Sequence, residues 1–263
     1  MKQVHRFQRA KISSKESTWG VQKNAYEQLD FQSHVFAKTR IFASDLQGHL
    51  SRNLTIAKVA GLAFVSGKDN KTKNIVDLGG GAGLDFFIHR ELIGGDKFWT
   101  CLETEALCEV LLNKNLNEKK LQFSTLSDFL QKSHKRFDFA LYSNSALQYI
   151  SEPINALNSL LLMRPTRVAI VRTPFVIEGV QVQTTQKSIL DKNGPQVGGS
   201  DVLREIFNPI TIVKIDTIRK LFQQNGYRVI CENVQAGSFT KRNLINLKKS
   251  RVRTVDFLVS RID

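Results

Sequence analysis

Short apolar runs alternate with stretches of helical periodicity from about residue 71 to the end of the chain. Runs rich in Val, Ile, Leu and Phe predict buried strands, whereas apolar positions three and four residues apart predict helices. The pattern predicts seven strands, at about residues 75–78, 98–102, 121–123, 136–143, 167–172, 228–233 and 254–261. It predicts helices between them, at about residues 84–92, 129–132, 153–163 and 216–224. Such alternation is typical of an α/β fold.

The first 70 residues follow another pattern, without strand alternation or glycine-rich loops. A helical stripe of apolar side chains runs through Phe42, Leu46, Leu50, Leu54 and Ala57. The stripe predicts an N-terminal helical cap or extension, residues 1–70, that packs on the domain of residues 71–263 or closes over its ligand crevice. A dimerisation or purely structural extension is the alternative, because one stripe does not name its partner.

A glycine-rich turn follows the first predicted strand, in the sequence Asp77-Leu78-Gly79-Gly80-Gly81-Ala82-Gly83. Glycines let the backbone turn tightly beneath a ligand before the next helix begins near Leu84. A dinucleotide fingerprint requires Gly-x-Gly-x-x-Gly, and Leu84 or Phe86 stands where its third glycine belongs. A turn without any ligand is the alternative, since many strand-to-helix connections contain glycine.

The spacing Asp77-x-Gly79-x-Gly81-x-Gly83 resembles the first motif of class I S-adenosylmethionine-dependent methyltransferases. The resemblance covers about residues 71–263. It implies a Rossmann-like seven-stranded sheet, mostly parallel with an antiparallel last strand, and S-adenosyl-L-methionine as the cofactor. It further implies that the amino-acid end of the cofactor is held by the acid and the loop backbone, at Asp77, Leu78, Gly79, Gly80, Gly81 and Gly83.

An acid also follows the second predicted strand, at Glu103. In nucleotide-binding α/β folds an acid at this place projects into the ligand crevice and accepts hydrogen bonds from ribose hydroxyls. The alternative is an exposed acid favoured by the dipole of the next helix. Residues 124–128 would border an adenine ring, although Ser127 and Asp128 equally suit a helix cap.

Polar residues follow the fourth predicted strand, where the resemblance implies that acceptor and methyl donor meet. Ser143 is a candidate for cofactor binding, and Asn144, Gln148 and Tyr149 are candidates for catalysis, with Tyr149 as a core residue the alternative. The triple glycine, Leu147-Gln148-Tyr149 and Arg172-Thr173-Pro174-Phe175 together resemble a poorly characterised bacterial branch of methyltransferases, some of which are associated with surface-polysaccharide biosynthesis.

Residues 175–208 are too long for a simple connection between a strand and the following helix. Long insertions are often functional, so we expect a substrate lid in which polar side chains contact an acceptor. The candidates are Glu178, Gln181, Gln183 and Asp191. A mobile surface loop without a catalytic role is the alternative.

Composition excludes several classes of protein. No apolar run has the length of a membrane span, and the first residues lack the apolar core of a secretory signal, so we expect a cytoplasmic protein. Cys101, Cys108 and Cys231 show neither metal-ligand spacing nor a disulfide framework, so we expect reduced thiols and no metal. His89 and His134 are expected at the surface rather than as bases.

The formal net charge of +14 is unevenly placed, with six basic residues and no acid in residues 241–253. A basic patch steers anions such as phosphates, anionic sugars or nucleic acid, but a solvated basic face is the simplest interpretation. No alternation of aromatic and basic residues indicates a stacking platform.

The resemblance therefore implies transfer of a methyl group to a small-molecule or carbohydrate-linked acceptor, with an oxygen acceptor slightly favoured. A nucleic-acid methyltransferase and a non-catalytic cofactor-binding protein of the same fold are the alternatives, because fold alone does not determine function. Oligomeric state is not predicted.

Overall fold

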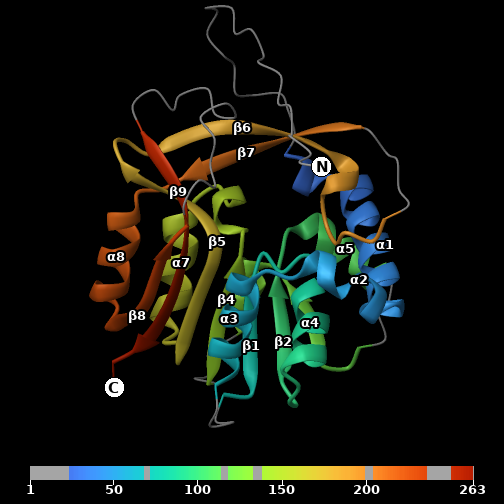
Figure 1. Ribbon diagram of the computed structural model, residues 1–263, viewed down its shortest axis with the longest axis horizontal. Coiled ribbons are helices and arrows are strands. Elements are labelled where there is room, and N and C mark those ends of the chain that lie inside the picture. Colours follow the sequence, from blue (N-terminus) through green and yellow to red (C-terminus); the bar gives the residue numbers. More distant parts are fainter. Residues whose placement is uncertain are drawn as a thin grey trace, which may run out of the picture.

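Five neighbouring parallel strands, from the edge strand β3 to β5, belong to a seven-stranded sheet with the order β3-β2-β1-β4-β5-β9-β8. The computed structural model describes residues 24–67, 72–113, 118–132, 138–198, 204–235 and 250–262 (Figure 1). The strands are β1 Asn74–Leu78, β2 Phe98–Leu102, β3 Leu121–Ser124, β4 Phe139–Asn144, β5 Arg167–Glu178, β8 Tyr227–Val234 and β9 Arg251–Arg261. The last strand, β9, is antiparallel to both β5 and β8. The predicted fold is therefore confirmed.

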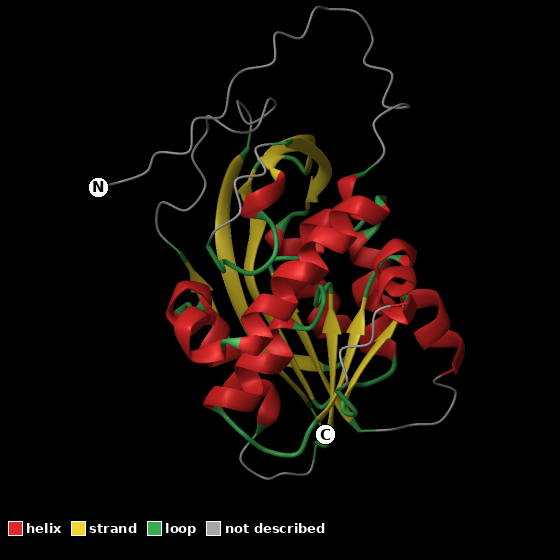
Figure 2. Cartoon of the chain, turned by 90° about the vertical axis from the view of Figure 1, so that its right-hand side faces the viewer, coloured by secondary structure: helices red, strands yellow, loops and turns green. Residues whose placement is uncertain are grey.

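Helices cover both faces of this sheet (Figure 2). One apolar core joins strand residues to α3 Ile56–Ser66 and α4 Leu84–Leu92. The core of the opposite face includes residues of α6 Leu126–Lys132, α7 Pro153–Leu162 and α8 Ile215–Gln224. Central strands such as β4 are buried along nearly their whole length, which explains why they read as continuous apolar runs.

The N-terminal helices share the core of the sheet. They are α1 Leu29–Ser44 and α2 Leu46–Asn53, preceded by the short 3-10 helix η1 Ala25–Glu27. The stripe from Phe42 to Ala57 lies against the same core as α3 and α4. It crosses two helix boundaries: Asp45 caps α2 by accepting the backbone N–H of Gly48, and Thr55 caps α3 by accepting that of Lys58.

The insertion at residues 175–208, expected to form a substrate lid, contains two strands that the apolar pattern did not predict. Strand β5 continues through Pro174 to Glu178, and β6 Val182–Ile189 pairs antiparallel with β7 Glu205–Ile212. The 3-10 helix η3 Leu190–Lys192 follows β6. The β6–β7 ribbon arches across the carboxyl ends of the parallel strands (Figure 1).

Other boundaries differ slightly from the predicted ones. Helix α6 begins at Leu126 rather than Phe129, because the Thr125 hydroxyl accepts the backbone N–H of Asp128 and caps the helix. Ser127 and Asp128 therefore lie inside α6 rather than in a loop. Within the described ranges, no helix is long and apolar enough to cross a membrane.

Candidate functional site

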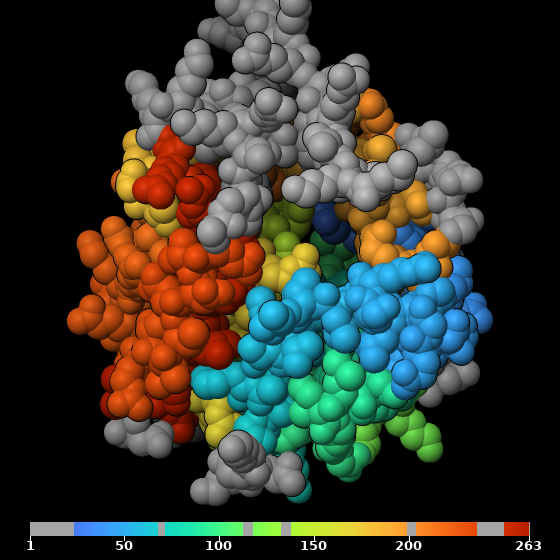
Figure 3. Space-filling model, viewed as in Figure 1, coloured from blue at the N-terminus to red at the C-terminus, as the bar shows by residue number. Residues whose placement is uncertain are grey.

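A cleft of about 910 Å³ lies at the carboxyl ends of the parallel strands. Its floor includes the glycine loop after β1, residues at the ends of β2 and β4, and Arg172 within β5, while η1, α1 and the β6–β7 ribbon contribute the roof. Figure 3 shows the molecule hollowed between the N-terminal helices and the elements that follow β5. Ligands of open α/β sheets bind at this edge.

The glycine loop needs its glycines for two separate reasons. Gly79, Gly81 and Gly83 have φ angles of 75°, 58° and 88°, in the left-handed region that residues with a side chain avoid. A Cβ on Gly79 would lie 2.2 Å from the Cβ of Ala146 in the loop after β4. A Cβ on Gly81 would meet nothing within 4 Å, and Gly81 lines the cleft. The loop thus presents bare backbone to any ligand bound there.

Glu103 lies beside this loop at the end of β2, as predicted. Its Oε1 accepts the backbone N–H of Gly81 at 2.7 Å, and its Oε2 accepts the N–H of Thr104 at 3.1 Å. Burial raises the pKa of Glu103, while these two hydrogen bonds act in the opposite direction. The two N–H groups fix the carboxylate at the cleft wall and leave lone pairs on both oxygens for further donors.

The loop residues Leu78, Gly79, Gly80 and Gly81 line the cleft, but Asp77 does not lie where it was predicted. Its side chain is buried beneath the loop, and Oδ2 accepts the indole N–H of Trp99 at 3.2 Å. A Cβ on Gly80 would lie 2.6 Å from this oxygen. Burial raises the pKa of Asp77 well above its ordinary value, and the neighbouring Asp85 raises it further. Asp77 supports the loop from below.

Three other predicted site residues are placed behind the lining of the cleft. The Ser143 hydroxyl donates to the Leu78 carbonyl at 2.9 Å and joins the ends of β4 and β1. Gly83 caps α4, where a Cβ would lie 2.6 Å from the Leu121 side chain. Gln148 is buried and donates to the Ser145 carbonyl at 2.8 Å. These residues hold the loops rather than face the cleft.

Asn144 lines the cleft within a polar chain that sequence patterns did not reveal. Lys58 of α3 and Asp85 of α4 form a buried ion pair at 2.9 Å. The Asn144 amide donates to Asp85 Oδ2 at 2.7 Å, and its Oδ1 lies 3.4 Å from Nη1 of Arg172. The chain Lys58, Asp85, Asn144 and Arg172 runs along the cleft. These four residues are far apart in sequence, so no local motif predicts that they lie together.

Tyr149 also lines the cleft and joins the loop after β4 to the roof. Its hydroxyl donates to Oε1 of Gln186 in β6 at 2.6 Å, and its ring centre lies 5.0 Å from that of Tyr26. Burial raises the pKa of Tyr149. The phenol is therefore neutral near pH 7, where it acts as a hydrogen-bond donor and not as a base.

The roof is fastened to the N-terminal helices by polar bonds. Buried Lys38 of α1 donates to the carbonyls of Asp191 at 2.5 Å and Asn193 at 2.9 Å. Asn53 of α2 accepts the N–H of Gln196 at 2.8 Å and donates to its carbonyl at 3.2 Å. The segment after β6 thus packs on α1 and α2 instead of standing free.

Of the polar candidates in this cover, Gln183 lines the cleft. Glu178 pairs with Arg251 at 3.0 Å in an exposed position, and Gln181 is exposed. Asp191 faces His34 and Lys38 of α1, at 3.7 and 3.9 Å. These three do not line the cleft.

The expectation for His89 is wrong, because its side chain is buried in α4 against Ser66 and Trp99. Burial lowers the pKa of His89 to about 4, so the imidazole is neutral near pH 7. His134 and residues 241–249 lie outside the described residues. Cys101, Cys108 and Cys231 are free thiols. The described part of the chain contains no group of three or more acidic, His and Cys side chains able to hold a metal ion.

Neither a protein-family model nor a curated protein sequence matches the chain. Solved structures with a similar chain path include the N-terminal domain of EvdMO1 with S-adenosylhomocysteine bound, at 14% identity and a TM-score of 0.46, covering 82% of this chain and 84% of that one. The Burkholderia thailandensis 1,6-didemethyltoxoflavin-N1-methyltransferase matches at 12% identity and 0.45, covering 85% and 88%.

CalS10, an amino pentose methyltransferase from Micromonospora echinaspora, matches at 12% identity and a TM-score of 0.47, covering 82% of this chain and 95% of that one. At such low identities, the role of a residue in one of those proteins does not indicate the role of a residue in this chain. The strand order with its antiparallel last strand gives the chain the fold of class I S-adenosylmethionine-dependent methyltransferases.

Proposed function

We propose that the chain is an S-adenosylmethionine-dependent methyltransferase that acts on a small-molecule or carbohydrate-linked acceptor. The observation that carries the proposal is the pairing of the glycine loop with Glu103. A bare backbone turn and a carboxylate oriented by two N–H groups adjoin one cleft at the ends of β1 and β2.

The residues present fit an adenosyl cofactor. Glu103 keeps lone pairs on both oxygens that can accept two ribose hydroxyls, and Gly81 leaves open space where a side chain would stand. Leu126, at the start of α6, offers an apolar contact for a base in the same cleft. When bound, S-adenosylmethionine supplies an electrophilic methyl group.

The cleft volume favours a small acceptor. Pockets for single small ligands enclose about 300–1,000 Å³, and a cofactor would occupy part of the 910 Å³ present. The amide of Asn144, the hydroxyl of Tyr149 and the amide of Gln183 line the remaining space. Such neutral hydrogen-bonding groups suit a hydroxyl-rich molecule, so we propose an oxygen acceptor.

These side chains contribute mainly by holding the acceptor in place. Orientation of a nucleophile in line with the reacting carbon supplies several kcal/mol of catalysis in well-fitted sites. Tyr149 is tied to Gln186 of the roof, so the ribbon also fixes the position of its hydroxyl. A roof fastened over the cleft would exclude water from the reacting atoms, which strengthens each polar contact inside.

The test is calorimetric titration with S-adenosylhomocysteine and with NAD. We expect the sulfur nucleoside alone to bind, and Glu103→Ala to weaken that binding while Glu105→Ala does not. Glu105 is a matched control because it is exposed at the start of α5 Glu105–Asn113. Binding of NAD alone would contradict the proposal.

A second experiment separates an enzyme from a cofactor-binding protein. Wild type is incubated with labelled S-adenosylmethionine and a panel of sugars, sugar phosphates, phenols and amines, and the products are identified by mass spectrometry. Cofactor binding without any labelled product would favour the non-catalytic alternative. No contact of the described residues favours a nucleic-acid acceptor.

A further inference from the structure

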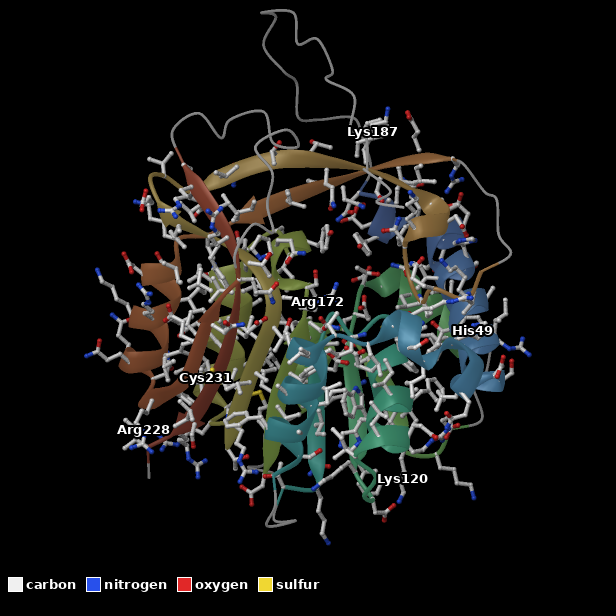
Figure 4. All side chains as sticks on the ribbon, in the orientation of Figure 1. His49, Lys120, Arg172, Lys187, Arg228 and Cys231 are labelled. Carbon is white, nitrogen blue, oxygen red and sulfur yellow. The ribbon has the colours of Figure 1, made fainter. Side chains whose placement is uncertain are left out.

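Arg172 places a positive charge in the cleft, away from the glycine loop and Glu103. It lies in β5 at a register shift between Ile170 and Thr173, and its half-buried side chain lines the cleft. Figure 4 shows it near the centre of the molecule, beneath the β6–β7 ribbon. Neither the glycine loop nor Glu103 contacts it in any described hydrogen bond.

The backbone of Arg172 is held in an uncommon conformation. Its φ angle is 55°, in the left-handed region that residues with a Cβ rarely adopt. The Arg172 N–H donates to Oδ1 of buried Asp256 at 2.7 Å. Asp256 also accepts the side-chain amides of Asn233 at 2.9 Å and Gln235 at 3.0 Å. Surroundings that enforce a strained residue occur most often at functional sites.

The guanidinium of Arg172 has no ion-pair partner among the described residues. It makes a hydrogen bond of 3.4 Å to Oδ1 of Asn144, which is long for such a bond. Asp85 lies one step further along the chain of contacts, but Lys58 at 2.9 Å already neutralises it. Arginine carries five N–H donors, so most of them remain available to a ligand in the cleft.

Electrostatic effects of Arg172 reach the acceptor side of the cleft. Burial raises the pKa of Tyr149, and the positive charge of Arg172 is one of the influences that act against this rise. Tyr149 in turn bonds to Gln186 of the roof. The cation therefore lies near the phenol, Asn144 and the ribbon, in the space left for an acceptor.

The sheet order separates Arg172 from the cofactor residues. Glu103 follows β2 and the glycine loop follows β1, whereas Arg172 lies in β5, with β4 between β5 and β1. Neighbouring strands are about 4.8 Å apart, so β5 lies roughly 14 Å from β2 across the sheet. A nucleoside seated on Glu103 and the loop would leave Arg172 at the far end of the cleft.

We propose that Arg172 binds an anionic group of the acceptor, a carboxylate or a phosphate, and thereby selects acidic small molecules. A guanidinium matches both groups with two parallel hydrogen bonds. The proposal rests on the methyltransferase function, because there is an acceptor only if the chain transfers a methyl group. The carboxylate of the cofactor itself is the other source of the same chemistry, and the experiment distinguishes the two.

The test compares wild type with Arg172→Gln and with Arg228→Gln. Arg228 is exposed in β8 and lies outside the lining of the cleft, so its substitution changes the net charge equally. First, S-adenosylhomocysteine and 5′-methylthioadenosine, which lacks the amino-acid end, are titrated into each protein. We expect unchanged affinities within about twofold. A tenfold or larger loss for S-adenosylhomocysteine alone in Arg172→Gln would assign Arg172 to the cofactor and overturn the proposal.

Second, inorganic phosphate and benzoate are titrated into ¹⁵N-arginine-labelled protein saturated with S-adenosylhomocysteine, at constant ionic strength. The Arg172 Nε–Hε resonance, identified by its loss in Arg172→Gln, is expected to shift and saturate in the millimolar range for at least one anion. The Arg228 resonance is expected to shift weakly and without saturation. Identical behaviour of the two resonances would overturn the proposal.

The two proposals fail in different ways. If S-adenosylhomocysteine does not bind to folded wild type, the methyltransferase proposal fails, and the same anion titration is carried out without it. A saturable shift at Arg172 under those conditions supports an anion site in the cleft. Its absence overturns that site as well.

Discussion

The buried ion pair of Lys58 and Asp85 leads to a strong prediction about stability. The two charges lie 2.9 Å apart, with 3% and 8% of their side chains exposed. At that separation the attraction is about 6 kcal/mol for an effective dielectric constant of about 20, before the cost of desolvation. Lys58→Met leaves Asp85 with Asn144 as its polar partner, and an uncompensated buried charge costs about 3–5 kcal/mol.

Chemical and thermal unfolding followed by circular dichroism measure this loss. For a chain of this size, 1 kcal/mol corresponds to about 2–4 °C, so Tm should fall by roughly 6–20 °C. The double variant Lys58→Met with Asp85→Asn removes both charges and should regain most of the lost stability. A loss below about 1 kcal/mol in the single variant, or no recovery in the double variant, would refute the reasoning.

Three further predictions concern the loop, the cofactor contact and pH. Gly79→Ala should cost about 1–3 kcal/mol in unfolding free energy, because the positive φ strains any residue with a Cβ and the new atom would lie 2.2 Å from Ala146 Cβ; a Tm equal to wild type would contradict this. Glu103→Gln should weaken the binding of S-adenosylhomocysteine by about 10- to 100-fold, as measured by calorimetry, since hydrogen bonds to a charged acceptor contribute about 1.5–3 kcal/mol. Equal weakening by Glu105→Gln would show a general charge effect instead. Burial lowers the pKa of His89 to about 4, so the unfolded state binds a proton at a higher pH than the folded state. The free energy of unfolding should therefore fall by about 3 kcal/mol between pH 6.5 and 4. His89→Gln should flatten this part of the curve of unfolding free energy against pH.

Much of the sheet could be predicted because its strands are short apolar runs between clear turns. Strand β2 and helix α4 have the predicted bounds. The β6–β7 ribbon was missed even though alternate residues of β7 from Ile206 to Ile212 are buried. Its inward positions include Asn208, so the hydrophobic alternation on which strand prediction depends is interrupted there.

The site could be predicted only where one local motif carries it. Glu103 and the glycines could be predicted because they come directly after two apolar strands, and the structure places them together. The direction of the Asp77 side chain could not be predicted, because the sequence of a central strand buried on both faces does not indicate which way a polar side chain points. The contacts of Lys58 and Arg172 join segments that lie far apart in sequence, and no periodicity reports such contacts.

Distant parts of the chain cover the two ends of the cleft, but the two covers are joined to each other. Above the Glu103 end, the Tyr26 carbonyl of η1 accepts the Thr104 hydroxyl at 3.0 Å. At the other end, the ribbon is joined to the floor through Tyr149 and Gln186. Polar bonds and an apolar cluster also tie the ribbon to η1, α1 and α2, so one cover cannot open without loosening the other. We therefore expect the cofactor and the acceptor to exchange during the same opening movement.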